Sequence, residues 1–87
     1  MALVWIPSLL RDLSGGKENI LIPGANVQQI VDGLEQQFPG VRNRLCPNGT
    51  LRPGLAVSID GIVARFGMLE PVKPDREGHF LPAIAGG

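Results

Sequence analysis

The C-terminal end of the chain carries the residues best suited to chemistry, a terminal carboxylate on two successive glycines, Gly86 and Gly87. Glycine has no Cβ atom, so such an end can adopt backbone conformations that are closed to other residues. It can also approach other groups more closely than a residue with a side chain. A terminal carboxylate of this kind could enter a narrow site of another protein. Two terminal glycines alone would favour a frayed end, so a chemical role depends on what precedes them.

An apolar segment with one proline precedes the two glycines, Leu81-Pro82-Ala83-Ile84-Ala85. Because proline restricts the backbone, Pro82 is expected to stiffen the exit from the last strand and to lower the entropy lost when a partner takes up the tail. Leu81 and Ile84 supply apolar side chains that could dock in a partner's groove. We therefore predict a flexible tail over residues 82–87, with residues 81–85 binding partners.

The chain has one cysteine, Cys46, and one histidine, His79. A single cysteine excludes an intramolecular disulfide and a cysteine metal cluster, and we expect no metal site. A reactive thiol needs a base or positive surroundings, which the sequence around Cys46 does not offer. We interpret Cys46 as an ordinary loop thiol. We interpret His79 as a partly exposed polar residue at a strand start, with a general base or pH sensor as the alternative.

One helix is predicted between residues 27 and 38. Its apolar residues recur with the 3.6-residue period of a helix that has one buried face; they are Val27, Ile30, Val31, Leu34 and Phe38. Asn26 can serve as N-cap, with Gln29 completing a capping box, and Pro39-Gly40 ends the helix. Gly33 inside the helix costs about 1 kcal/mol relative to alanine, for which close packing against a sheet is a reason.

Short strands are predicted on both sides of this helix. Residues 3–6 and 19–22 precede it and are expected to be antiparallel neighbours. Residues 55–59 and 62–66 follow the irregular segment 41–54, and the Asp60-Gly61 pair between them is typical of a type I′ hairpin turn. Residues 79–81 form the last strand. The pattern predicts an α+β fold, a mixed sheet with one main helix packed across it.

The composition indicates one small domain over residues 1–87. Eight basic residues balance eight acidic ones without clustering, which argues against nucleic acid and against a membrane surface as partners. The arginines (Arg42, Arg44, Arg52 and Arg65) are expected to form a solvated surface. The apolar N-terminal residues lack a positive flank and stop at Pro7, so we expect a first strand and not a signal sequence. The lack of a disulfide framework favours the cytoplasm.

The element order, the length and the ending together resemble the ubiquitin-like sulfur carriers. This family includes the small subunit of molybdopterin synthase, the thiamine sulfur carrier and the sulfur carriers of cysteine biosynthesis, which the ending resembles most. The helix end Phe38-Pro39-Gly40 and the turn at Ile59-Asp60-Gly61 match too, and residues 80–87 are the diagnostic part. The resemblance implies a β-grasp fold with the first and last strands parallel at the sheet centre. Residues 74–79 depart from the family's acidic turn.

The resemblance also implies a chemistry for Gly87. In such families an adenylating enzyme related to the ubiquitin activators uses ATP to adenylate the terminal carboxylate, and a sulfur donor replaces AMP to leave a thiocarboxylate. Gly87, with Gly86 beside it, would carry the sulfur to an acceptor that resembles a cysteine synthase. The chain would then be a protein co-substrate with no bound cofactor, and not an enzyme.

Other interpretations remain open. As the small subunit of molybdopterin synthase, the chain would insert its tail into a large subunit and would count as part of an enzyme. As a ubiquitin-like modifier or interaction module, it would form isopeptide bonds through Gly87 or no covalent bond. Trp5 and Phe66 are expected in the core. Alternatively, Phe66, or its neighbours Met68 and Leu69, lies in an exposed apolar patch that binds the activating enzyme.

Overall fold

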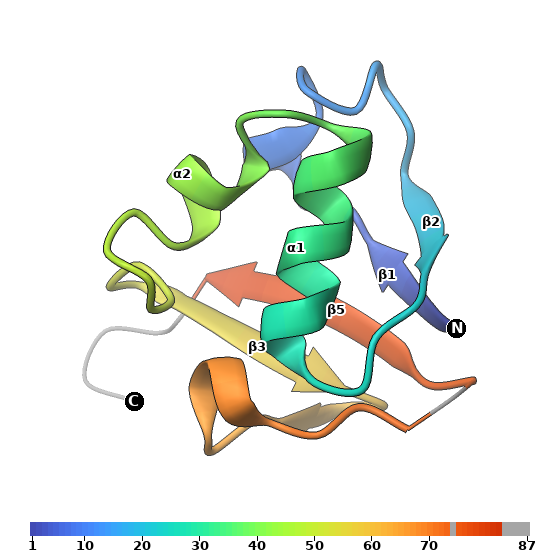
Figure 1. Cartoon of the computed structure of the whole chain (residues 1–87), viewed down its shortest axis with the longest axis vertical. Helices are drawn as coiled ribbons and strands as arrows, with labels where there is room; N and C mark the ends of the chain where they lie inside the picture. Colours follow the sequence, from blue (N-terminus) through green and yellow to red (C-terminus); the bar gives the residue numbers. More distant parts are fainter. Residues whose placement is uncertain (74, 83–87) are drawn as a thin grey trace.

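A computed structural model of the chain describes residues 1–73 and 75–82. It shows a five-stranded sheet crossed by one long helix (Figure 1). The elements follow the predicted order, with three short helical segments added: β1 (Ala2–Trp5), η1 (Ser8–Leu10), β2 (Asn19–Ile22), α1 (Val27–Gln37), α2 (Val41–Leu45), β3 (Leu55–Ile59), β4 (Ile62–Val63), η2 (Gly67–Leu69) and β5 (Glu77–Pro82).

The sheet has the strand order β2-β1-β5-β3-β4. β1 is antiparallel to β2, with Ala2 opposite Ile22, and parallel to β5, with Leu3 opposite Glu77. β5 is antiparallel to β3 on its other side. The first and last strands therefore lie side by side in the middle of a mixed sheet, which confirms the β-grasp fold that the resemblance implied.

The N-terminus of α1 is capped as the sequence predicts, with one difference. The Asn26 side chain accepts a hydrogen bond from the Gln29 backbone N–H at 2.8 Å. The Gln29 side chain reaches back to the backbone N–H of Ala25 at 2.6 Å, one residue before the position that a capping box uses. Both interactions satisfy backbone donors at the helix start, and they fix the point at which the chain enters α1.

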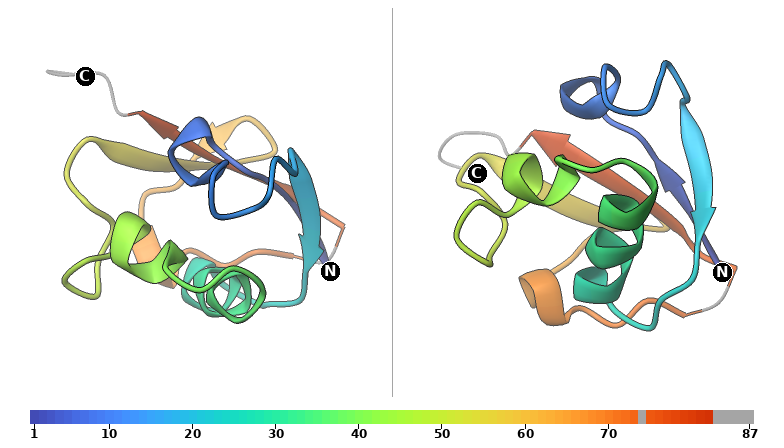
Figure 2. Two further views of the ribbon diagram at one scale, coloured as in Figure 1. Left: turned by 90° about the horizontal axis from the view of Figure 1, so that it is seen from above. Right: turned by 45° about the horizontal axis from the view of Figure 1, so that its top comes forward.

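The buried face of α1 is turned toward one side of the sheet (Figure 2), and α1 contacts β2. Val31 and Leu34 are fully buried there, in one hydrophobic core with Val4 of β1 and Ile22 of β2. A Cβ atom on Gly33 would come within 2.6 Å of the Ile22 side chain. This confirms that Gly33 allows the helix to approach β2 closely.

The segment 41–54 was predicted to be irregular, but it begins with a short helix, α2. Val41 and Leu45 are buried one helical turn apart on α2. Their spacing of four residues, which can be read from the sequence, is the spacing of one helix face. The Glu35 carboxylate accepts hydrogen bonds from the backbone N–H groups of Arg42 at 2.8 Å and Gly40 at 3.2 Å. Both bonds lower the pKa of Glu35, and the bond from Arg42 has the larger effect. They also satisfy backbone donors at the N-terminal end of α2.

The hairpin after β3 is shorter than predicted. Positive φ angles at Asp60 (51°) and Gly61 (84°) confirm the expected turn, because a type I′ turn needs both. The strand predicted to reach Phe66 ends at Val63, however. The Glu70 carboxylate accepts hydrogen bonds from the backbone N–H groups of Arg65 and Phe66, at 2.8 and 3.2 Å, which turns the chain into η2.

The other strands differ only at their ends. β1 covers residues 2–5 and not 3–6, although Ile6 is still buried, and β5 is longer than the predicted 79–81. No helix among the described residues is long and apolar enough to cross a membrane.

Replacing Leu34 with alanine should lower the free energy of unfolding by about 2–5 kcal/mol, because Leu34 is completely buried between α1 and the sheet. Denaturant unfolding measures this change. Gln36→Ala, on the exposed face of the same helix, is the matched control and should change stability little. A loss well under 1 kcal/mol for Leu34→Ala would contradict this packing.

Candidate functional site

β5 carries the base of the predicted tail. It runs through the sheet next to β1 and ends at Pro82, which lies opposite Leu55 at the beginning of β3. Leu81 pairs with Ala56 in the same ladder. The predicted tail over residues 82–87 thus includes the last residue of a strand. Its remaining residues (Ala83, Ile84, Ala85, Gly86 and Gly87) lie outside the described part of the chain.

The beginning of β5 is fixed by the β3–β4 turn. The Asp60 carboxylate accepts a hydrogen bond from the Glu77 backbone N–H at 2.9 Å and pairs with Arg76 at 2.8 Å. The Asp60 backbone N–H donates to the Glu77 carbonyl at 2.9 Å. The Glu77 hydrogen bond, and next the Arg76 guanidinium, lower the pKa of Asp60. The sequence indicated only the turn; its Asp-Gly signal did not show that Asp60 also holds β5.

An arginine network connects η1 and α2 with the approach to β3, the strand that pairs with the far end of β5. Arg44 donates to the Leu9 carbonyl and to the Asp12 carboxylate, both at 2.9 Å. Arg52 in turn donates to the Arg44 carbonyl at 3.2 Å. The predicted solvated arginines are therefore not all scattered, because Arg44 and Arg52 join η1, α2 and the approach to β3.

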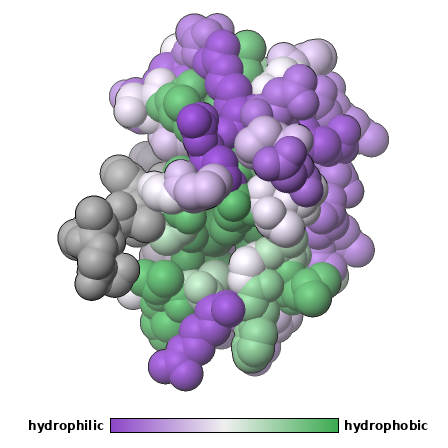
Figure 3. All heavy atoms as spheres, turned by 90° about the vertical axis from the view of Figure 1, so that its left-hand side faces the viewer, coloured by the Kyte–Doolittle hydropathy of each residue, from purple (hydrophilic) through white to green (hydrophobic). Residues whose placement is uncertain are grey.

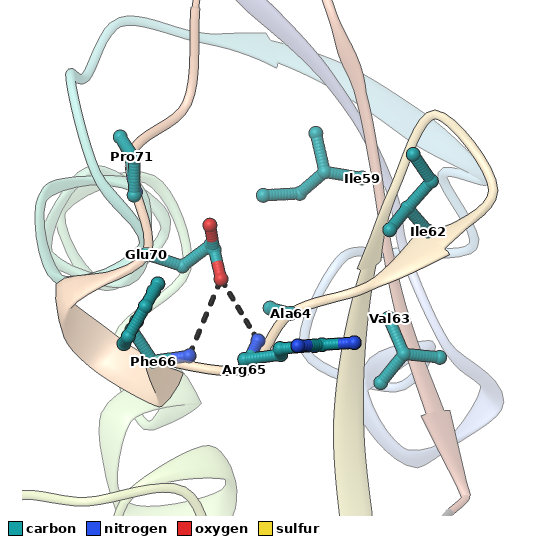
Figure 4. A pocket seen from close by; sticks show the side chains of 8 residues that line it. All are labelled: Ile59, Ile62, Val63, Ala64, Arg65, Phe66, Glu70 and Pro71. Atoms are coloured by element: carbon teal, nitrogen blue, oxygen red, sulfur yellow. Dashed lines mark hydrogen bonds between the residues drawn. The ribbon is translucent and has the colours of Figure 1, made fainter.

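Phe66 is exposed (69%), so the core interpretation of this residue is wrong. Ile62 and Val63 are also exposed, and together with Phe66 they line a shallow pocket of about 270 Å³ (Figure 4). Leu69, three residues after Phe66 on η2, is exposed as well, and these four residues make up the apolar surface around Phe66, on the side of the molecule seen in Figure 3. Met68 does not belong to this surface, because it is 8% exposed and packs in the core.

Trp5, also expected in the core, is only half-buried. Its indole N–H donates to the Glu77 carboxylate at 3.4 Å. The side chain therefore keeps its polar group paired at the end of β1, as is usual for a partly buried tryptophan.

Cys46 is not a loop thiol but a core residue at the C-terminal end of α2, 3% exposed. Its Sγ lies 3.5 Å from the Met68 Sδ. Burial raises the pKa of the thiol, and the weaker effect of Arg42 opposes that rise. A buried thiol with a raised pKa is a poor nucleophile, so this site offers no cysteine chemistry.

His79 lies within β5, where its backbone pairs with Trp5 on one side and Ser58 on the other. The structure does not describe the side chain of His79, so its predicted partial exposure stays a prediction. Across residues 1–73 and 75–82, no group of three or more potential ligands could hold a metal ion.

Comparison with known proteins gives three kinds of match. The model of the ThiS family matches residues 4–87. A sulfur carrier protein, CysO, of Mycobacterium tuberculosis is 28% identical over 89 residues, covering 97% of this chain and 96% of the relative. A chain in the Amycolatopsis orientalis BexX/CysO complex is 32% identical with a TM-score of 0.89, and each chain is fully covered.

A solved structure from an archaeon is similar in fold alone. Small archaeal modifier protein 1 of Methanosarcina acetivorans has a TM-score of 0.79 at 21% identity, covering 99% of this chain and 95% of that one.

Replacing Asp60 with asparagine should weaken the acid sensitivity of folding. Because the pKa of Asp60 is lowered in the folded state, its contribution to stability is present above the unfolded value of about 3.9 and is lost as pH falls through the folded value. The midpoint of thermal unfolding should therefore fall less steeply below about pH 4 in the variant, and should be lower at neutral pH.

Glu18→Gln is the matched control for Asp60→Asn, since the described structure gives the Glu18 side chain no hydrogen bond. The same pH profile for Asp60→Asn as for the native chain would show that this carboxylate does not hold β5.

Cys46 should resist alkylation in the folded chain, because it is buried with a raised pKa. Modification by iodoacetamide, followed by mass spectrometry, should become fast only when denaturant unfolds the chain. Rapid labelling of the folded chain, with an unchanged thermal transition, would contradict the burial of this thiol.

Proposed function

Because the chain belongs to the ThiS family, we propose that it is a sulfur carrier whose Gly87 is converted to a thiocarboxylate. The observation that carries this proposal is the combination of a central β5, which ends at Pro82, with a five-residue extension to Gly86-Gly87. The relative's name, sulfur carrier protein, supports the same role.

The proposed reaction begins with activation of the terminal carboxylate, which is a poor electrophile at neutral pH. A separate adenylating enzyme joins it to the α-phosphate of ATP, so that pyrophosphate leaves and an acyl-adenylate forms. Sulfide then attacks the acyl carbon, the C–S bond forms, AMP leaves with the C–O bond electrons, and the thiol proton is lost to give the thiocarboxylate. The glycines suit this step because a side chain at Gly87 would lie beside the reacting carbonyl.

The folded part of the chain presents the tail to the partner enzymes and contributes no catalytic group. β5 is fixed at its beginning by Asp60 and paired on both sides, so the tail leaves from a rigid base. A rigid base lowers the entropy lost when an enzyme takes up the tail. The partner enzymes supply the catalytic groups.

For the acceptor, we propose an enzyme of cysteine biosynthesis or of another pathway to a sulfur-containing metabolite. The relatives named CysO, and the assembly of one of them with BexX, support a carrier that works with separate partner proteins. A small subunit of molybdopterin synthase would instead co-purify with a large subunit in fixed stoichiometry. We propose the cytoplasm as the place of this reaction, because the activation consumes ATP and reduced sulfur.

We also propose that the apolar surface around Phe66 contributes to partner binding. Four large apolar side chains exposed together on one small domain are more than isolated surface residues. Among these four residues, Phe66 is positioned by the Glu70 carboxylate, which accepts hydrogen bonds from the backbone N–H groups of Arg65 and Phe66.

Incubation with ATP, sulfide and an adenylating enzyme of the same host should raise the intact mass by the difference between sulfur and oxygen, localised to Gly87. The chain lacking Gly87 should show no such change while keeping the same thermal transition, because a chain end contributes few contacts.

Failure of the native chain to gain sulfur, with the adenylating enzyme active on its usual substrate, would contradict the carrier role. High-mass adducts on denaturing gels that disappear on deletion of Gly87 would indicate a modifier in its place.

A further inference from the structure

A second pocket lies where β5 ends. It has a volume of about 270 Å³ and is lined by residues from η1 and from the approach to β3: Pro7, Ser8, Leu9, Arg52, Pro53, Gly54 and Leu55. Leu55 is the residue opposite Pro82 in the sheet. The pocket therefore borders the point at which the chain continues beyond β5, whereas the Phe66 surface follows the other end of β3.

The walls of this pocket are rigid. Leu9 is tied through its carbonyl to Arg44, and the Arg44 carbonyl accepts a hydrogen bond from Arg52. The Arg52 backbone N–H also donates to the Leu45 carbonyl at 2.8 Å. Because Leu45 is fully buried, these bonds attach the pocket to the core. A partner that binds here does not have to order the site first.

The pocket combines apolar walls with an available positive charge. Leu9 is 38% exposed, and Arg52 is exposed as well. Asp12, Asp32 and Asp60 pair with other arginines, and in the described ranges no carboxylate pairs with Arg52. Among the described residues, the Arg52 side chain donates one hydrogen bond, to the Arg44 carbonyl, and a guanidinium has five donors. The complementary partner surface is an apolar side chain flanked by a carboxylate.

The length of the tail limits where such a partner can lie. Residues 83–87 span at most about 17 Å when fully extended. An enzyme that encloses Gly87 must therefore extend to within that distance of Pro82 and Leu55. Resting on the proposed function, we infer that this pocket is the docking site for the mouth of the channel through which the adenylating enzyme takes up the tail.

The adenylating enzyme is the favoured occupant because of the reaction that it must perform. An acyl-adenylate reacts with water, so its site must exclude water and enclose the tail deeply. Deep enclosure brings the enzyme surface against the base of the tail. The acceptor enzyme handles a thiocarboxylate, which does not need protection of this kind from hydrolysis.

The test is the affinity of the adenylating enzyme for variants of the full chain, measured by calorimetry without ATP, together with KM and kcat for thiocarboxylate formation. Arg52→Glu and Leu9→Asp should each raise Kd and KM roughly tenfold while kcat changes less than about twofold. Arg52→Lys keeps the positive charge, so its Kd and KM should lie between those of Arg52→Glu and those of the native chain.

Two matched controls lie away from the pocket. Lys73→Glu reverses an exposed charge before the other end of β5, and Leu21→Asp changes an exposed leucine on β2. Both should leave Kd and KM unchanged. Thermal unfolding of every variant shows that each is folded at the assay temperature.

Native affinity in Arg52→Glu and Leu9→Asp would overturn the docking site, even with full sulfur transfer to Gly87. So would weakened binding of the acceptor enzyme alone. The Kd is measured without ATP, so binding is tested separately from sulfur transfer. If the variants weaken binding as expected but the native chain gains no sulfur, the proposed function is contradicted and the docking site remains supported.

Discussion

The parallel pairing of β1 with β5 is the interaction on which the rest of this structure depends. It joins the two ends of the sequence at the sheet centre, with Leu3 opposite Glu77. Parallel neighbours cannot be joined by a tight turn and need a long crossover. Here nearly the whole chain is that crossover, and α1 covers the sheet within it (Figure 1). The hydrophobic core is therefore closed only when both terminal strands are in register.

The two ends of β5 have different surroundings. At its beginning, polar contacts dominate: Asp60 binds the Glu77 backbone and Arg76, and the Leu3 backbone N–H donates to the Arg76 carbonyl at 2.9 Å. At its end, the neighbouring surface is a pocket with apolar walls and one available arginine, Arg52. One end thus fixes the register of the strand, and the other presents a surface beside its exit.

Features that depend on local patterns could be predicted from the sequence. The apolar period from Val27 onward gave α1 with its N-cap, and Asp60-Gly61 gave the turn. Gly33 was correctly explained by close packing, because a glycine inside a helix has few other reasons. The central position of β5 came from the resemblance and not from the pattern, since alternation does not say which strands pair.

Features set by distant contacts could not be predicted. α2 is too short for a periodic signal and forms because Glu35 caps it and the core accepts Val41 and Leu45. The chain leaves β4 early because Glu70 binds the backbone N–H groups of Arg65 and Phe66. The same turn exposes Phe66, an aromatic residue expected in the core. The burial of Cys46 follows from α2 in the same way.

The central place of the final strand has a consequence for synthesis. A ribosome releases the N-terminal part of a domain first, and many domains begin to fold while synthesis continues. The sheet of this chain cannot be completed until residues 77–82 have been synthesised, because they form β5 between β1 and β3. The strand that is synthesised after the other four therefore becomes an inner strand of the sheet. A product truncated before residue 77 lacks both this strand and Gly86-Gly87, so the two glycines are never presented without the strand that precedes them.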